Sequence, residues 1–321
     1  MHAPLRPRLC PTPPQLRLAP QARAVTDASD PASAIDLVLE GQPRDLGGFP
    51  VRRVLPAGKR RAVGPFIFLD HMGPVDLAPG AGMDVRPHPH IGLATITYLL
   101  SGEIVHRDSI GSLQTIRPGD VNWMSAGRGI AHSERTPPDS RARGSRTLGL
   151  QTWVALPREH EDSAPSFEHH PHHTIPLIER PGATLRVIAG TAYGRAAPTG
   201  VLSPTLFVHA ELAPGVELVI DDEHTERAVY VIDGEIECDG QTFGAATLIV
   251  LRPARHVAVR AHTAANLALI GGAPLDGPRR MWWNFASTSA ERIEQAKADW
   301  REGRFAKVAG DEIEFVPLPE R

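Results

Sequence analysis

Short apolar segments, separated by Gly, Pro and Asp, follow one another from residue 35 to about residue 275. The clearest of them are residues 63–69, 91–100, 113–116, 148–155, 185–189, 206–212 and 228–232. Segments of this length at turn-sized spacing are typical of the strands of a β-sandwich or β-barrel. The sequence therefore predicts an all-β fold over most of the chain.

The pattern changes near the C-terminal end. Residues 288–291 (TSAE) form a capping-box pattern, which is typical of a helix start. Ile293, Ala296 and Trp300 follow at helical spacing, and Gly303 is a natural stop. We therefore expect one amphipathic helix of about three to four turns.

A faint internal repeat divides the β-rich region. Residues 98–104 (YLLSGEI) match residues 230–236 (YVIDGEI), which lie 132 residues further along the chain. A repeat distance of this size is a plausible domain length. We therefore expect two β-barrels in one chain.

Four segments follow from these patterns. We expect a tail over residues 1–34, an N-terminal barrel over residues 35–178, a C-terminal barrel over residues 179–275, and the helix with its tail over residues 276–321. The first 24 residues hold four Arg and six Pro but no acidic residue. This composition favours a disordered tail, or a start codon placed too far upstream.

Composition excludes several classes of protein. The formal net charge of −3 argues against direct nucleic-acid binding. No apolar stretch approaches the length of about 18 residues that a membrane span needs, so no membrane contact is expected. Cys10 lies in the Pro-rich tail and Cys238 in a strand-like run, so we expect no disulfide framework. A reducing, cytoplasmic compartment fits this cysteine usage.

Two pairs of potential metal ligands are spaced two residues apart. His88 and His90 precede an apolar run, and His132 and Glu134 follow a Gly-rich turn. Residues i and i+2 of a β-strand point to the same face of the sheet. Two neighbouring strands would therefore direct three imidazoles and one carboxylate to one point. This donor set suits a divalent transition metal and leaves coordination positions open.

Most of the 15 His are expected to be solvated or to make ordinary hydrogen bonds. Residues 168–173 (EHHPHH) are predicted to form an exposed loop, because a Pro interrupts them and no strand pattern flanks them. His106 and Asp108 are placed in the turn after Gly102 and are assigned no role.

The second copy of the repeat lacks the ligand pairs. At the repeat distance, His88 and His90 fall on Ile220 and Asp222. The segment that corresponds to the second pair reads VAV, at residues 257–259. His224 and His256 lie nearby but out of register, and a slip of one residue points a strand side chain to the wrong face. The C-terminal barrel is therefore predicted to be structural and to bind no metal.

Four segments of the chain resemble the pirin family. They are residues 64–74 (GPFIFLDHMGP), 86–92 (RPHPHIG), 124–134 (MSAGRGIAHSE) and 149–154 (GLQTWV). The resemblance extends over residues 35–305, and residues 281–285 (MWWNF) favour the bacterial branch of the family. It implies a bicupin, so the expected fold is all-β, with two jelly-roll-like cupin barrels followed by the amphipathic helix.

The resemblance also implies a metal. Pirins bind one metal, usually iron, in the N-terminal barrel, while the C-terminal barrel has lost its ligands. Matched motif to motif, the ligands of the family fall on His88, His90, His132 and Glu134. We therefore expect one divalent metal per chain, and Fe(II) is the expected ion. Mn, Ni, Co, Cu and Zn also suit a ligand set of three His and one Glu.

Two classes of function follow from the resemblance. Some pirins resemble quercetin 2,3-dioxygenases in activity, which implies a flavonol-like aromatic substrate, O₂ as the second substrate and release of carbon monoxide. Glu134 would then be a ligand, a general base toward the flavonol hydroxyl, or each in turn. The alternative is a non-catalytic, iron-binding, redox-responsive regulator, which acts through a protein partner that the sequence does not identify.

Three residues beside the motifs have two interpretations each. Asp70 and His71 either accept a hydrogen bond from the second ring N–H of a ligating His, or lie in a turn whose side chains hydrogen-bond to its own backbone. Arg128, beside the predicted ligand strand, either orients a substrate oxygen or is a solvated turn residue.

Overall fold

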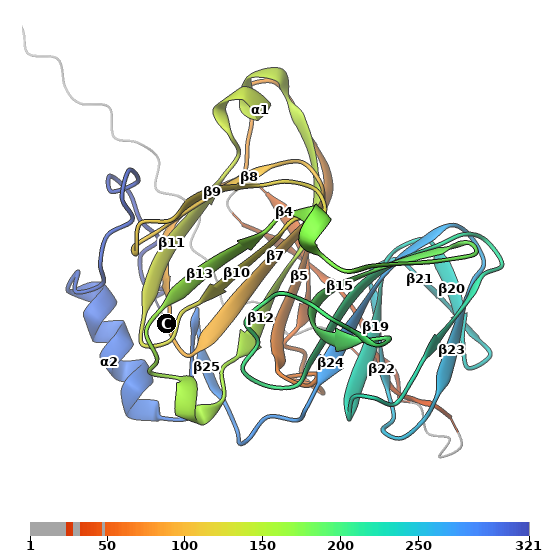
Figure 1. The fold of residues 1–321 in the computed structure, drawn as a ribbon. Helices are drawn as coiled ribbons and strands as arrows, with labels where there is room; N and C mark the ends of the chain where they lie inside the picture. The colour runs from red at the N-terminus through yellow and green to blue at the C-terminus, as the bar shows by residue number, and fades with distance from the viewer. Residues whose placement is uncertain (1–23, 28–32, 47–48, 321) are drawn as a thin grey trace, which may run out of the picture.

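The computed structural model describes residues 24–27, 33–46 and 49–320, and it shows two β-barrels side by side (Figure 1). The predicted all-β fold with a C-terminal helix is confirmed. Most of the predicted tail lies outside the described residues. Among the helices of the described part of the chain, none is long and apolar enough to cross a membrane.

Two antiparallel sheets form the N-terminal barrel. In strand order, the larger sheet consists of β13 (Ser166–His170), β10 (Val121–Ser125), β7 (Leu93–Ser101), β12 (Ser145–Ala155), β5 (Phe66–Leu77), β4 (Pro50–Leu55) and β3 (Gln42–Asp45). The smaller sheet consists of β6 (Asp84–His90), β11 (Ile130–Arg135), β8 (Ile104–Asp108) and β9 (Leu113–Ile116).

The C-terminal barrel is built in the same way. Its larger sheet consists of β1 (Ala24–Asp27), β2 (Ile35–Glu40), β22 (Thr247–Leu251), β19 (Glu226–Asp233), β24 (Ala265–Gly272), β17 (Thr205–Leu212), β15 (Ala183–Ala192) and β14 (Leu177–Arg180), with β16 (Arg195–Ala196) beside β15. Its smaller sheet consists of β18 (Glu217–Ile220), β23 (Val257–Ala261), β20 (Glu235–Cys238) and β21 (Gln241–Gly244).

The two barrels share one strand order, which accounts for the repeat in the sequence. Tyr98 lies on β7 and Tyr230 on β19, and these two strands hold equivalent places in their sheets. In the same way β6 corresponds to β18, and β11 to β23. The described part of the chain begins in the C-terminal sheet, where β1 pairs with β2. β2 precedes the N-terminal barrel in the sequence, but it pairs with β22 and so extends the C-terminal sheet.

The large sheets of the two barrels pack against each other around one shared apolar core. Phe66 and Tyr98 contribute from the N-terminal barrel, and Phe207 and Tyr230 from the C-terminal one. The rings of Phe66 and Phe207 meet edge to face, with their centroids 5.8 Å apart. Burial of these apolar faces holds the barrels together, because it removes a large apolar area from water.

After the second barrel the chain returns to the first. β25 (Arg280–Trp282) and β26 (Phe285–Ser287) form a hairpin that lies close to β6. Phe285 pairs with Ile91, the residue that follows β6, and the backbone N–H of Ala286 donates to the carbonyl oxygen of Ile91 at 3.1 Å. The C-terminal hairpin therefore supports the end of β6 from outside the barrel.

The helix α2 (Ala290–Arg301) follows the hairpin, as predicted. Its N-cap is Ser289, whose hydroxyl accepts a hydrogen bond from the backbone N–H of Arg292. The capping pattern placed the cap one residue earlier, at Thr288. The backbone N–H and the hydroxyl of Thr288 instead donate to the buried carboxylate of Glu161. A tertiary contact therefore competes with the local cap and moves it by one residue.

The connections of the N-terminal barrel contain short helical segments and one strand that the pattern did not predict. The segments are α1 (Pro138–Arg143) and the 3-10 turns Arg158–His160 and His172–Thr174. The prediction of a loop over residues 168–173 was wrong for residues 168–170, which belong to β13 and pair with β10. β13 lies at the edge of its sheet, where polar side chains reach water on both faces and the apolar alternation is lost.

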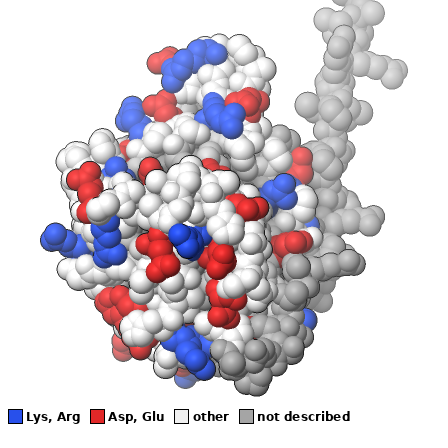
Figure 2. All heavy atoms as spheres, turned by 90° about the vertical axis from the view of Figure 1, so that its right-hand side faces the viewer, with Lys and Arg blue, Asp and Glu red and all other residues white. Residues whose placement is uncertain are grey.

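Charged side chains are interspersed on the outer face of the C-terminal barrel (Figure 2). Acidic and basic groups neighbour one another there, in keeping with a formal net charge of −3 for the whole sequence.

Candidate metal centre

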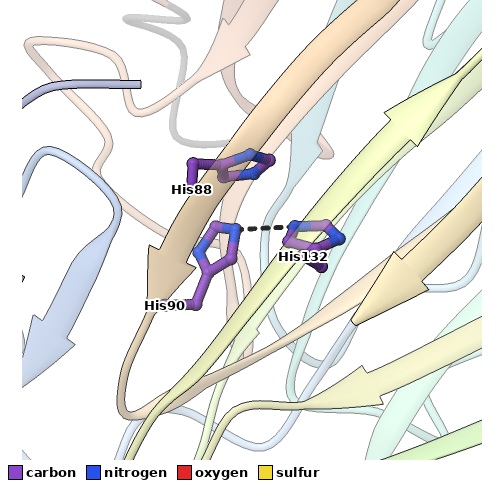
Figure 3. Close-up of side chains that lie close together, drawn as sticks. All are labelled: His88, His90 and His132. Carbon is purple, nitrogen blue, oxygen red and sulfur yellow. Dashed lines mark hydrogen bonds between the residues drawn. The ribbon is translucent and has the colours of Figure 1, made fainter. Parts of the chain in front are cut away.

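Three histidines meet inside the N-terminal barrel because of the register between β6 and β11. The two strands are antiparallel, and His88 lies directly opposite His132. His90 is two residues beyond His88 and therefore points to the same side of the sheet. Figure 3 shows the three rings converging from the two strands.

The ring nitrogens of this cluster are close enough to share one ion. One ligand atom from each of His88, His90 and His132 lies within 4.8 Å of the other two. Nε2 of His90 is 3.1 Å from Nε2 of His132 (Figure 3). His90 and His132 are each 1% exposed and His88 is 7% exposed, so the cluster is buried.

Backbone carbonyls fix the ring protons of two of these residues. Nδ1 of His88 donates to the carbonyl oxygen of Arg86 at 2.9 Å, and Nδ1 of His90 donates to that of Asn284 at 3.1 Å. A carbonyl oxygen can only accept, so a neutral ring carries its proton on Nδ1. Nε2 of both rings therefore carries a lone pair. The C-terminal hairpin supplies Asn284, so it takes part in orienting His90.

The third histidine has a different support, which the sequence did not reveal. Nδ1 of His132 lies 3.4 Å from Nδ1 of His106, and Nε2 of His106 lies 3.1 Å from a carboxylate oxygen of Asp108. His106 and Asp108 are buried on β8, next to β11, and do not lie in a turn. Their two-residue spacing was the available signal, since it matches that of the ligand pairs.

The electrostatics of the cluster favour neutral rings. Burial lowers the pKa of His88 to about 4. Burial also lowers the pKa of His90 and of His132 well below the ordinary value, and the neighbouring imidazoles add to the effect. Neutral imidazole is the form of His that binds a metal. Three neutral rings whose nitrogens converge therefore fit a divalent transition metal.

Glu134 lies on the same strand as His132 and is also buried. Its Oε1 accepts hydrogen bonds from the hydroxyl of Thr97 at 3.2 Å and from the side-chain amide of Gln151 at 3.3 Å. Thr97 and Gln151 lie opposite each other on β7 and β12, in the facing sheet. Burial raises the pKa of Glu134, although His106 and these two donors work against the shift.

The carboxylate of Glu134 does not belong to the group of three ligand atoms that lie within 4.8 Å of one another among the described residues. A β-bulge between His132 and Glu134 shifts the register against β6, and the two hydrogen bonds hold Oε1 toward the facing sheet. Its role as a fourth ligand therefore stays a prediction.

Aromatic side chains border the cluster. The ring of Trp153 meets that of His90 edge to face at 5.1 Å, and it stacks on Phe68 at 3.9 Å. Phe167 stacks on His106 at 4.4 Å. The cluster therefore lies between polar donors from the facing sheet and apolar rings.

The other candidate residues are occupied elsewhere. Asp70 accepts two hydrogen bonds from the guanidinium of Arg53, and His71 bonds to Tyr230 of the C-terminal barrel. Arg128 is exposed. This exposure agrees with the interpretation of Arg128 as a solvated turn residue.

The equivalent place in the C-terminal barrel is apolar. Leu218 and Ile220 on β18 face Val259 and Val257 on β23. All four are buried in the aliphatic interior of that barrel. Cys238, on β20, stands at the repeat distance from His106 and is buried in the same interior.

A chain of two cupin-type barrels, of which the N-terminal one encloses a histidine cluster, is a bicupin. The sequence matches the family model described as Pirin over residues 48–154 and the model described as Pirin C-terminal cupin domain over residues 207–306. A pirin-like protein of Caulobacter vibrioides is 50% identical over 89% of this chain and 100% of its own length. The chain belongs to the pirin family.

Two further similarities concern proteins named for an activity. A protein of Pseudomonas aeruginosa named "Putative quercetin 2,3-dioxygenase" is 40% identical over 85% of this chain and 87% of its own. The crystal structure of a quercetin 2,3-dioxygenase from Acinetobacter baumannii has a TM-score of 0.83 at 31% identity, and the match covers 88% of this chain and 95% of that one. The bicupin fold is thereby confirmed.

Proposed function

We propose that this protein is a metal-dependent dioxygenase that opens the heterocycle of flavonol-type substrates with O₂. One observation carries the proposal: three buried imidazoles converge in the lumen of a cupin barrel, and a buried carboxylate stands two residues from one of them on the same strand. The similarity to proteins named quercetin 2,3-dioxygenase supports the choice of substrate class. Fold alone would not, since cupin barrels serve many functions.

We propose His88, His90, His132 and Glu134 as the ligand set, with Fe(II) as the metal. A divalent transition metal held there would supply Lewis acidity toward a substrate hydroxyl and a route for electrons between the substrate and O₂. The protein contributes imidazole rings whose protons lie on Nδ1, away from the site. The backbone carbonyl oxygens of Arg86 and Asn284 accept these protons in hydrogen bonds from His88 and His90. Such preorganisation favours metal binding because no ring has to lose a proton first.

We further propose Glu134 as the general base for the flavonol hydroxyl. A carboxylate with a raised pKa is a stronger base than a solvated one, and burial has this effect on Glu134. Thr97 and Gln151 both hold Oε1, so Oε2 takes part in neither of these hydrogen bonds. In the proposed step, Oε2 accepts the hydroxyl proton while Thr97 and Gln151 keep the carboxylate in place.

The aromatic border of the site suits a flat aromatic substrate. Trp153 and Phe68 form one stacked pair beside His90. Rings of this kind bind other aromatic rings by offset stacking or edge-to-face contact, and they exclude water. Exclusion of water would strengthen the hydrogen bonds and charges inside the site.

The proposal is tested by metal analysis of the purified protein, followed by a flavonol assay on the same sample. We expect one metal per chain, consumption of quercetin only when O₂ is admitted, and release of carbon monoxide. His256→Ala, which changes an exposed His of the C-terminal barrel, is the matched control and should leave all three quantities unchanged. Absence of turnover with each of Fe, Mn, Ni and Co would refute the proposed activity.

A further inference from the structure

We propose that His106 and Asp108 are positioning residues that keep the ring proton of His132 on Nδ1 and thereby leave its Nε2 free for a metal. The inference rests on the proposed metal site. It concerns two residues that do not belong to the proposed ligand set, of which His106 contacts the ring of His132 and Asp108 contacts His106.

The geometry of His132 presents a choice between two contacts. Its Nε2 lies 3.1 Å from Nε2 of His90, and its Nδ1 lies 3.4 Å from Nδ1 of His106. A neutral ring carries one proton, so it can donate to only one of these neighbours. If the proton lies on Nε2, it blocks the lone pair that a metal needs. The partner of Nδ1 therefore decides whether His132 can act as a ligand.

Asp108 defines which nitrogen of His106 carries a proton. One carboxylate oxygen of Asp108 accepts from the backbone N–H groups of Ile110 and Ser112, at 3.1 and 2.9 Å. The other oxygen faces Nε2 of His106 at 3.1 Å. An ionised carboxylate only accepts, so Nε2 of His106 must donate.

The consequence passes through His106 to the ligand. With its proton on Nε2, a neutral His106 presents a lone pair at Nδ1, which accepts from Nδ1 of His132. Phe167 stacks on the ring of His106 at 4.4 Å, and His106 is buried, so its ring is held in this orientation. The hydrogen-bonded series Asp108–His106–His132 thus keeps the ring proton of the third ligand on Nδ1. Backbone carbonyls have the same effect on His88 and His90.

Asp108→Asn is the most informative substitution. The amide oxygen has to remain with the two backbone N–H groups, so the amide nitrogen replaces the oxygen that faces His106. It then donates to Nε2 of His106, which moves the proton of His106 to Nδ1 and that of His132 to Nε2. An isosteric change two side chains away is therefore expected to place a proton where the metal binds.

Two readouts test this inference. Two-bond ¹H–¹⁵N correlation spectra of the metal-free protein report the tautomer of each His. We expect His132 to carry its proton on Nδ1 in the wild type and on Nε2 in Asp108→Asn. Competition with a chelator gives the affinity for Co(II), which should fall by about 10- to 100-fold in this variant, as is typical for loss of a partner behind a ligating His.

Two variants of His106 separate positioning from packing. His106→Gln keeps an oxygen toward His132 and an N–H toward Asp108, and should retain most of the Co(II) affinity. His106→Leu keeps the volume but offers no acceptor, and should lose affinity by the same factor as Asp108→Asn. Asp120→Asn is the matched control. Asp120 is also buried and also accepts from backbone N–H groups, those of Arg117 and His172, and its carboxylate otherwise faces the rings of His169 and His172.

The possible outcomes are distinct. Equal Co(II) affinity in Asp108→Asn and wild type, or an unchanged tautomer of His132, would overturn the inference while leaving the metal site standing. Equal affinity losses in Asp120→Asn and Asp108→Asn would also overturn it, since general destabilisation would then explain the effect. If the wild type bound no metal, the proposed site would fail, and the tautomers of the metal-free proteins would still decide whether Asp108 controls His132.

Discussion

The hydroxyl of Tyr230 lies 2.9 Å from Nδ1 of His71 and so joins the C-terminal barrel to the N-terminal one. Tyr98, which matches Tyr230 in the repeat, makes the same contact in the opposite direction, to Nδ1 of His209 at 2.9 Å. All four side chains are buried. The internal repeat therefore reappears as two related hydrogen bonds across the apolar core that the barrels share.

These hydrogen bonds should contribute measurably to stability. Tyr230→Phe leaves Nδ1 of the buried His71 without its partner, and such a loss costs about 1–3 kcal/mol. Urea unfolding at neutral pH should show this decrease in the free energy of unfolding. Tyr193→Phe is the control, because the hydroxyl of Tyr193 bonds to the carbonyl oxygen of Val219 in an exposed place and should matter less. Equal effects of the two changes would contradict the prediction.

Stability should fall in acid because of His71. Burial, helped by the charge of Arg52, lowers the pKa of His71 to about 4, whereas that of an unfolded His is about 6.5. The unfolded chain therefore binds a proton before the folded one does. The contribution of neutral His71 is complete above about pH 6.5 and is lost as the pH falls toward 4.

The difference between the folded and unfolded pKa values of His71 corresponds to about 3 kcal/mol of unfolding free energy. His71→Gln removes the titrating group and can still accept from Tyr230. Between pH 7 and pH 4.5 the wild type should therefore lose about 2–3 kcal/mol more than this variant. Urea unfolding at both values measures the difference. Parallel losses would show that His71 does not titrate between the two states.

Loss of one imidazole should empty the proposed metal site without unfolding the barrel. His88 is the most exposed of the three His, so His88→Ala leaves the smallest buried cavity. We expect most of the metal to be lost while the circular dichroism spectrum is retained. Metal content by mass spectrometry checks this, with His256→Ala as the control. Full occupancy in His88→Ala would remove this residue from the ligand set.

Glu134 should matter for turnover beyond its effect on metal content. In Glu134→Gln the amide oxygen can still accept from Thr97 and Gln151, but the basicity is lost. With metal restored, turnover of quercetin should fall by about 10²–10⁴-fold, as is typical for loss of a general base. The measurement is flavonol consumption and carbon monoxide release at matched metal content. Equal turnover would exclude Glu134 from the proton transfer.

Local patterns in the sequence were sufficient for several features of this protein. Apolar segments between turn residues predict the strands, the helical spacing of Ile293, Ala296 and Trp300 predicts α2, and the match between Tyr98 and Tyr230 predicts two barrels of one kind. The spacing of His88 and His90 also predicts a shared face. Each of these inferences depends on residues within a few positions of one another, or on one copy of a motif repeated in another.

The hydrogen-bond partners of the three clustered histidines depended on tertiary structure. His90 donates to Asn284, 194 residues away, and His132 contacts His106 only because β8 pairs with the far side of β11. Strand order and register arise from the packing of whole sheets, which no local pattern contains. The sequence by itself determined which residues could bind a metal. The tertiary structure decided which ring nitrogens face the site, because each proton follows a hydrogen-bond partner brought by another strand.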